Sequence, residues 1–248
     1  MGARRIWGAV GAAALLAASM TSAPASAGSG YALLMGHTET GTAPLRWNPC
    51  QTAITYKVNT TYAHHKGSTA SEAATRALSE VRKAMGKVAA ATGLPFQYAG
   101  TTSIIPTGTN WYTKQNAGSE IVIAYADQDA TRSRSSFLGG TAWGQGGQVY
   151  AYEGSRLVVG RGFVVIDGDK TKRMDLGFGP GTHRGNIVLH ELGHVVGLDH
   201  VSSRSQLMYP TLSDSSPDGY AWGDLAGLKR LGASAGCIKG AADLWPGS

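Results

Sequence analysis

The residues best suited to chemistry in this chain lie between His190 and His200, in the stretch HELGHVVGLDH. His190 and His194 are four residues apart, so on an α-helix their rings leave the same face one turn apart. Imidazole nitrogens with that spacing suit two ligands of one tetrahedral zinc ion. Glu191 falls on the same side, where it can hold a water at the metal without being a ligand itself. Gly197 lets the chain turn out of the helix, so that His200 can return as a third ligand.

The whole stretch follows the pattern H-E-x-x-H-x-x-G-x-x-H. The alternative interpretation is a buried helix whose histidines only form hydrogen bonds, but such a helix does not require all of these positions together. With this motif the chain resembles the metzincin metalloendopeptidases, and within them the matrixin branch. The resemblance is to a secreted bacterial protein of the matrixin type.

A second segment strengthens this resemblance. Residues 207–210 (LMYP) are similar to the Met-turn, the tight turn that lies beneath the metal in metzincins. Tyr209 follows Met208 directly, as in matrixins, whereas astacin-like members have their tyrosine at the position that Pro210 takes here. The resemblance implies that Met208 forms an apolar floor under the metal.

The resemblance also implies a fold and an activity. The fold is α+β: a mixed, twisted β-sheet with an active-site helix, a Met-turn and a C-terminal helix. The activity is hydrolysis of peptide bonds by water at one catalytic zinc ion, with the three histidines as ligands and Glu191 as the general base. The implied partner is a polypeptide substrate, and we expect a monomer.

Substrate-binding residues are implied in the same way. Tyr209 and Thr211 are expected to line the pocket wall on the primed side. The segment LGGTAWG is similar to the matrixin segment at the edge of the sheet, so Gly140, Thr141 and Ala142 are expected to pair with an extended peptide. A glycine-rich loop around a packed tryptophan is the alternative for this segment.

Two other classes of function fit the motif. One is a secreted zinc-binding or wall-associated module without catalysis, but such a module does not need the carboxylate of Glu191 between its ligands. The other is a metallohydrolase that acts on non-peptide amides such as cell-wall cross-links, which the basic composition permits. The matrixin-like Met-turn favours an ordinary polypeptide as the substrate.

The first segment, residues 1–27, has the pattern of a signal peptide. Arg4 and Arg5 are followed by a small apolar run over residues 6–18, and residues 25–27 (ASA) offer a cleavage site. The apolar run is too short for a membrane span. We therefore expect a secreted, extracellular protein, with association to a cell wall as a second option and with general or twin-arginine export left open.

The remaining chain suits a single domain of roughly 220 residues. Residues 28–49 are expected to form a flexible N-terminal arm, and residues 50–248 the catalytic domain. The formal net charge of +6 falls to +4 without the leader, which holds two arginines and no acid. The basic residues are spread along the chain and do not form the clusters of a nucleic-acid binder, so no nucleic-acid partner is expected.

The chain has two cysteines, Cys50 and Cys237. Export to an oxidising compartment favours a disulfide between them. The alternative is that Cys50 is a thiolate ligand of the zinc, like the propeptide cysteine of matrixins, but the surrounding RWNPC does not resemble that propeptide motif. A disulfide is therefore the prediction.

Apolar periodicity and turn residues predict the elements that position the site. Thr69 and Glu72 form a capping box at the start of a helix that Gly93 ends. Asp218 or Asp224 is expected to cap the last helix. The predicted strands are 53–59, 94–102, 120–126 and 163–166, the last ending in a turn at 167–168; the other predicted helices are 186–197 and 220–231, and 144–160 is expected to be a loop or hairpin.

Further metal ligands are less well supported. Asp127 and Asp129 follow a predicted strand and are candidates for a calcium site, with solvated turn residues as the alternative. Matrixins usually carry histidine and aspartate ligands for a structural zinc in the region that corresponds to residues 144–168. No histidine lies between His65 and His183, which argues against a second zinc in this chain. We expect His183 to be surface-exposed at the start of the active-site helix.

Overall fold

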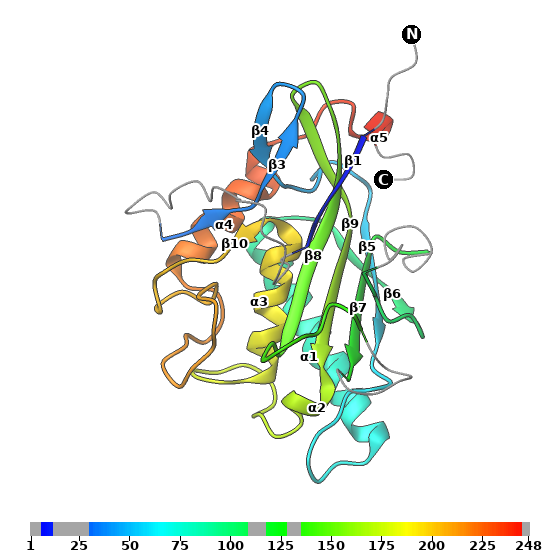
Figure 1. Ribbon diagram of the computed structural model, residues 1–248, viewed down its shortest axis with the longest axis vertical. Helices are drawn as coiled ribbons and strands as arrows, with labels where there is room; N and C mark the ends of the chain where they lie inside the picture. The colour runs from blue at the N-terminus through cyan, green and yellow to red at the C-terminus, as the bar shows by residue number, and fades with distance from the viewer. Residues whose placement is uncertain (1–5, 12–29, 109–117, 128–134, 245–248) are drawn as a thin grey trace.

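The structure is a computed structural model that describes residues 6–11, 30–108, 118–127 and 135–244, with the backbone alone described for 6–11. A six-stranded mixed sheet runs through the molecule in the order β1-β8-β9-β7-β5-β6 (Figure 1). Strands β5, β6, β7 and β9 are parallel, whereas β8 is antiparallel to both β9 and β1. The strands are β1 (Ile6–Gly11), β5 (Ile54–Asn59), β6 (Phe96–Thr101), β7 (Ile121–Ala126), β8 (Gly144–Glu153) and β9 (Arg156–Asp167).

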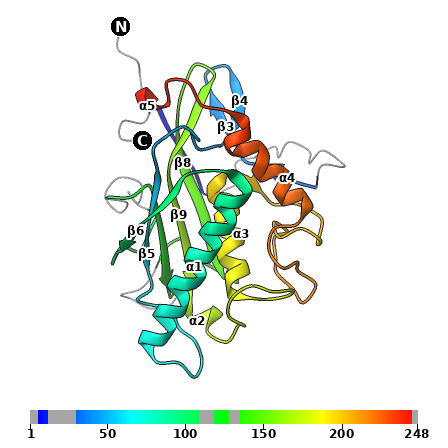
Figure 2. The same cartoon turned by 180° about the vertical axis from the view of Figure 1, so that it is seen from behind.

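Helices α1 (Ala70–Thr92) and α3 (Arg184–Val196) cover one face of this sheet (Figure 2). The predicted capping box is confirmed, because the Thr69 N–H donates to the Glu72 carboxylate at 2.8 Å and the Glu72 N–H donates to Thr69 Oγ1 at 3.3 Å. Gly93 ends α1 in the left-handed conformation, with a φ of 69°. The apolar sides of both helices pack on the sheet and form the main core.

The hairpin formed by β8 and β9 is longer than the sequence pattern predicts. A strand is expected over 163–166 and a loop or hairpin over 144–160, but the two strands together run from Gly144 to Asp167. Both faces of β9 are covered, so its buried side chains form a nearly continuous apolar run instead of an alternating pattern. The predicted turn after β9 is the start of a short helix, α2 (Gly168–Thr171), because the Asp167 side chain caps it.

The N-terminal arm is packed against the domain instead of being flexible in its described part. A short strand of the arm pairs with the strand that follows α3, and a hairpin lies against β8 and β9. Leu45 and Trp47 follow the hairpin, and both side chains are fully buried. These elements are β2 (Ala32–Leu33), β3 (Met35–Thr38), β4 (Gly41–Pro44) and, after α3, β10 (Leu198–Asp199).

The C-terminal part of the chain adds one short helix beside α3 and another against the hairpin formed by β8 and β9 (Figure 1). Asp224 caps the first of these helices, because its carboxylate accepts the N–H of Ala221 at 3.0 Å. Of the two predicted capping residues, the structure therefore selects Asp224 and not Asp218. The elements are α4 (Trp222–Leu231), η2 (Ala233–Ala235) and α5 (Ala241–Leu244).

The disulfide predicted between Cys50 and Cys237 is present, with a Cα–Cα distance of 5.4 Å. It joins residues 187 apart in the sequence, and the chain-entropy account gives such a loop a stabilisation of at most about 5 kcal/mol. Among the described residues, no helix combines the length and the apolar character that crossing a membrane requires.

Candidate metal centre and catalytic residues

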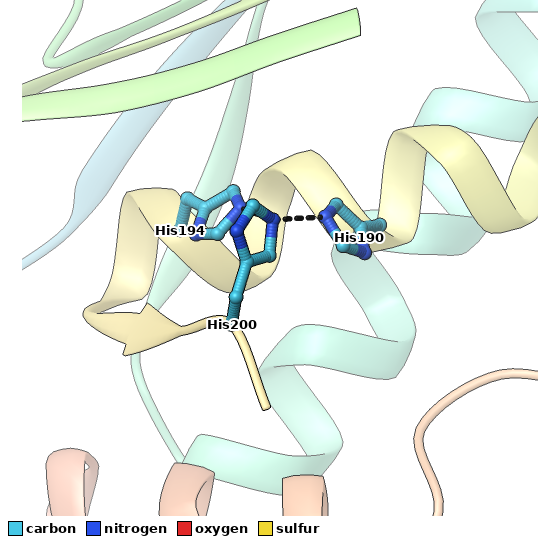
Figure 3. A group of neighbouring side chains, drawn as sticks. All are labelled: His190, His194 and His200. Atoms are coloured by element: carbon cyan, nitrogen blue, oxygen red, sulfur yellow. Dashed lines mark hydrogen bonds between the residues drawn. The ribbon is translucent and has the colours of Figure 1, made fainter. Parts of the chain in front are cut away.

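Helix α3 and the turn after it bring the three predicted ligands together. His190 and His194 lie one turn apart on α3, and Gly197 ends the helix with a φ of 109°. The chain then returns through β10, so that the His200 ring faces the other two (Figure 3). The Nε2 atom of His200 lies 3.2 Å from Nε2 of His190 and 3.1 Å from Nε2 of His194. Of the residues that the structure describes, these histidines form the one cluster of potential metal ligands.

The backbone fixes the orientation of two of these rings. His190 Nδ1 lies 2.8 Å from the carbonyl oxygen of Leu207, and His194 Nδ1 lies 2.9 Å from that of Leu198. Because a carbonyl oxygen only accepts, each Nδ1 carries the proton, and each Nε2 presents a lone pair to the centre of the cluster. Contacts of this kind are typical of metal-ligating histidines, whose second nitrogen is held by a hydrogen bond.

Electrostatics keep the rings neutral. Burial and the neighbouring His200 lower the pKa of His190 to about 4. Burial, followed by the two neighbouring imidazoles, lowers the pKa of His194 well below its ordinary value, and burial also lowers that of His200. The cluster is therefore a set of neutral imidazoles at neutral pH, which is the state that binds a metal ion.

The arrangement fits zinc. In a tetrahedral site with Zn–N distances of about 2.0–2.1 Å, the nitrogens lie roughly 3.3 Å apart. The measured Nε2 separations of 3.2 and 3.1 Å are close to that value. Three lone pairs at such short distances repel one another unless a cation or a proton lies between them.

Glu191 follows the first ligand and packs against strand β8. Its carboxyl group is buried, and burial raises its pKa to about 8, while a hydrogen bond from the backbone of Gly146 acts in the opposite direction. Glycines in β8 make this close packing possible. A Cβ at Gly144 would lie 2.9 Å from Glu191 Cγ, and a Cβ at Gly146 would overlap the Glu191 carbonyl oxygen. These glycines fall in the segment that the sequence predicts to be a loop or a hairpin, and glycine within a strand often marks such a close approach.

The Met-turn lies under α3. Met208 is buried, and a Cβ at Gly193 would lie only 2.5 Å from Met208 Sδ. Gly193 lies between the first two histidines in the chain, so the thioether packs against α3 at that point. The Leu207 carbonyl that holds His190 belongs to the same turn.

Asp224 and Gln206 hold this turn in place, a role that no sequence pattern indicates. The buried Asp224 carboxylate accepts the N–H groups of Leu207 at 2.7 Å and Met208 at 3.4 Å. Burial raises the pKa of Asp224, and these backbone hydrogen bonds oppose the shift. The Gln206 side chain accepts the N–H groups of Gly223 and Asp224 at 2.8 and 3.2 Å. The first turn of α4 and the Met-turn therefore form one hydrogen-bonded unit.

The opposite end of α3 is anchored by a buried ion pair. The Arg184 side chain is fully buried, and its Nε donates to the Glu80 carboxylate of α1 at 2.7 Å. Its Nη1 donates to the His64 carbonyl at 2.9 Å, and its guanidinium lies 5.5 Å from the ring centroid of Tyr125. Glu80 also accepts the N–H of Gly177. These contacts fix α3 relative to α1 and β7.

The predicted substrate-binding residues lie in two places. Gly140, Thr141 and Ala142 form a turn that leads into β8, and Lys170 Nζ donates to the carbonyls of Gly140 and Ala142 at 2.8 and 3.1 Å. Tyr209 lies within the Met-turn directly after Met208 and is half-buried, with the Arg204 guanidinium 5.1 Å from its ring centroid. Thr211 is exposed two residues further on.

Other candidates do not join the cluster. Asp129 of the predicted calcium pair lies outside the described residues, and Asp127 lies next to His64, whose Nε2 is 3.4 Å from Asp127 Oδ2. His183 immediately precedes α3 and is half-buried instead of surface-exposed, with Nδ1 3.4 Å from the Leu176 carbonyl oxygen.

Comparison with known proteins agrees with this geometry. The family profile described as Matrixin matches residues 46–231, a span that contains the three histidines, Glu191 and Met208. No curated protein matches the chain closely enough to count as a relative. The match covers most of the chain and includes both the metal motif and the Met-turn. The chain therefore belongs to the matrixin family of metzincin zinc metallopeptidases.

Proposed function

We propose that the chain is a secreted zinc-dependent metalloendopeptidase that hydrolyses peptide bonds, with Glu191 as its general base. One observation carries the proposal: three imidazole Nε2 atoms converge, and the helix that holds two of the histidines also carries the buried carboxylate of Glu191. Membership of the matrixin family supports both the metal and the class of reaction.

The three histidines would hold the zinc ion through Nε2. When bound, zinc polarises the substrate carbonyl and lowers the pKa of a water molecule. Three neutral ligands leave the charge of the ion undiminished, and the hydrogen bonds to Leu207 and Leu198 keep two of the rings in the required orientation.

Glu191 would accept the proton of the attacking water and deliver it to the leaving amine. Its buried position supports this role. Burial raises the pKa of the Glu191 carboxyl to about 8 in the ion-free site, and a positive charge nearby lowers that pKa toward 7, where a general base works best. The hydrogen bond from the Gly146 backbone restrains the carboxylate.

We place the substrate along the outer edge of β8, where an extended peptide can pair with backbone groups. Gly144 and Gly146 bring this strand against Glu191, and the turn at Gly140, Thr141 and Ala142 leads directly into it. The leader strand β1 pairs with the same edge further along, over residues 147–152, so removal of the leader would free that part for substrate.

Tyr209 and Thr211 are proposed to form the pocket wall on the other side of the cluster. Tyr209 lies in the Met-turn and Thr211 directly follows it. The Leu207 carbonyl of the same turn holds His190, so the turn connects these two residues to a proposed zinc ligand. Secretion is proposed from the leader pattern of residues 1–27, and the disulfide between Cys50 and Cys237 is compatible with it.

The test uses the chain that begins at Gly28, incubated with a peptide library with and without a chelator. We expect cleavage that the chelator abolishes and zinc restores. Glu191→Gln should retain one zinc ion per chain and lose cleavage by several orders of magnitude, whereas Glu39→Gln, in an exposed turn of the arm, should cleave normally. Undiminished cleavage by Glu191→Gln would exclude it as the base. A zinc-loaded parent chain that cleaves nothing would indicate a binding module.

A further inference from the structure

The segment between the last two zinc ligands is covered by the N-terminal arm. Strand β2 of the arm pairs antiparallel with β10, with Leu33 opposite Leu198 and Ala32 opposite Asp199. The Leu34 N–H then donates to the carbonyl of Gly197 at 2.8 Å. The arm therefore lies along the backbone from the end of α3 to the residue before His200.

The covered segment orients two of the three ligands. The carbonyl of Leu198 holds His194 Nδ1, and Asp199 leads directly into His200, whose N–H donates to the Asp199 carboxylate at 2.7 Å. The other ligand, His190, is held by the Met-turn and does not touch this segment's carbonyls. A shift of β10 would thus move two ligands relative to the third.

Close packing shows that the arm is built into this place. A Cβ at Gly197 would overlap the carbonyl oxygen of Leu45, and a Cβ at Gly223 would overlap that of Gly30. A Cβ at Gly227 would lie 2.7 Å from Leu198 Cδ2 and 3.0 Å from Tyr31 Cβ. The glycine that ends α3 and two glycines on α4 therefore leave the space into which the arm and β10 pack.

We propose that arm residues 31–34 are positioning residues of the zinc site, acting through β10 on His194 and His200. They lie outside the residues 46–231 that match the family, so the family comparison does not assign them this role. The proposal rests on the proposed zinc site and adds that its affinity depends on the arm. Loss of the arm contact, by substitution or by a cut in the arm, would weaken metal binding.

The first test removes a single hydrogen bond. Leu34→Pro eliminates the N–H that donates to Gly197, and the preceding Leu33 is already in a strand, as a residue before proline prefers. Leu34→Ala is the matched control, because it shortens the side chain and keeps the N–H. The measurement is the zinc dissociation constant of the full mature chain by competition with a chromophoric chelator, together with the unfolding midpoint of the zinc-free protein.

We expect Leu34→Pro to weaken zinc binding about 10-fold and Leu34→Ala to change it less than about 3-fold. The reason is that a shift of β10 displaces the Leu198 carbonyl, which is the outer partner of His194, and the loss of such a partner typically has an effect of that size. A Leu34→Pro protein that is less stable but binds zinc as tightly as the parent chain would overturn the proposal. A parent chain that binds no zinc would overturn the zinc site itself, which is a different result.

A second measurement needs no variant and applies even if Leu34→Pro does not fold. Coupling between two sites is reciprocal, so zinc should in turn stabilise the arm contact. We expect zinc to slow hydrogen exchange several-fold in peptides that cover residues 31–34 and 198–200. The exposed arm turn at Glu39 and Thr40 is the internal control and should not change. Slower exchange at 198–200 with no change at 31–34 would overturn the proposal.

Discussion

The two ends of helix α3 are held by different kinds of contact. At its N-terminal end the fully buried guanidinium of Arg184 binds Glu80 of α1 and the His64 carbonyl. At its C-terminal end the chain turns at Gly197, and the contacts are made by backbone groups. The Leu34 N–H of the arm donates to the Gly197 carbonyl, and the Leu198 carbonyl accepts from His194.

This difference separates stability from metal binding. A charged side chain anchors the first turn of the helix, where no ligand lies, so damage there should unfold the protein. Backbone groups shape the other end, which leaves the imidazoles free to face one another. Damage at that end should release the metal while most of the fold remains.

The largest effect is expected from a ligand. His194→Ala should remove bound zinc and reduce peptide cleavage by several orders of magnitude, because the remaining two imidazoles no longer complete the site. His183→Ala is the control, since His183 adjoins the same helix but lies outside the cluster. Metal content by atomic absorption and cleavage of a peptide substrate provide the measurement. Retention of zinc and activity by His194→Ala would remove it from the ligand set.

The buried ion pair gives the second effect. Glu80→Ala leaves the Arg184 charge buried without its partner, which should lower the free energy of unfolding by about 3–5 kcal/mol. Asp169→Ala, which removes a surface pair with Lys172, should change it by less than about 1 kcal/mol. Urea unfolding of the zinc-free proteins measures both. Equal effects of the two substitutions would contradict the role assigned to the N-terminal anchor.

The third effect is a pH dependence of the zinc-free protein. The folded Glu191 carboxyl keeps its proton up to about pH 8, whereas the unfolded chain releases it near 4.5. The folded state thus binds more protons between these values, so the free energy of unfolding falls as the pH rises. Between pH 6.5 and 8 the contribution of Glu191 to this fall should be about 2 kcal/mol. The three histidines of the cluster, whose pKa values are lowered in the folded state, contribute in the opposite direction near the lower end of this window.

The comparison variant for this pH dependence is Glu191→Gln, which cannot ionise. It lacks the Glu191 contribution and keeps that of the histidines, so the free energy of unfolding of the parent chain minus that of the variant should fall by about 2 kcal/mol over the same window, as followed by urea unfolding at each pH. Parallel curves for the two proteins would mean that the raised pKa of Glu191 does not contribute to stability.

The smallest effect concerns the Met-turn. Asp224→Asn retains one carbonyl oxygen as an acceptor, so at least one of its backbone hydrogen bonds is weakened. We expect a loss of about 1 kcal/mol in the free energy of unfolding and a modest decrease in zinc affinity through the Leu207 carbonyl. Asp218→Asn, at an exposed position, should change neither. Calorimetry and chelator competition would detect the difference.

The metal cluster could be predicted from the sequence because its contacts are local. His190, His194 and Gly197 are related by helix geometry, and the positive φ of Gly197 is what the motif requires. The capping box of α1 is predictable for the same reason, since its two residues are three apart and bond each other. Local spacing determines these features before any tertiary contact forms.

The surroundings of the cluster could not be predicted, because their partners are distant in the chain. Arg184 and Glu80 are 104 residues apart, and neither neighbourhood indicates the other. Gly144 and Gly146 resemble loop residues until α3 is packed against them. The arm precedes the predicted domain and is expected to be flexible, and only its pairing with β10 reveals its place.

The most direct test of the account is zinc K-edge X-ray absorption of the chain that begins at Gly28, loaded with one zinc ion. We predict a first shell of nitrogen and oxygen atoms at about 2.0–2.1 Å, with outer-shell scattering from three imidazole rings. His200→Ala should lose one of those rings or the metal altogether. A sulfur shell near 2.3 Å, or a site with fewer than three imidazoles in the parent chain, would contradict the account.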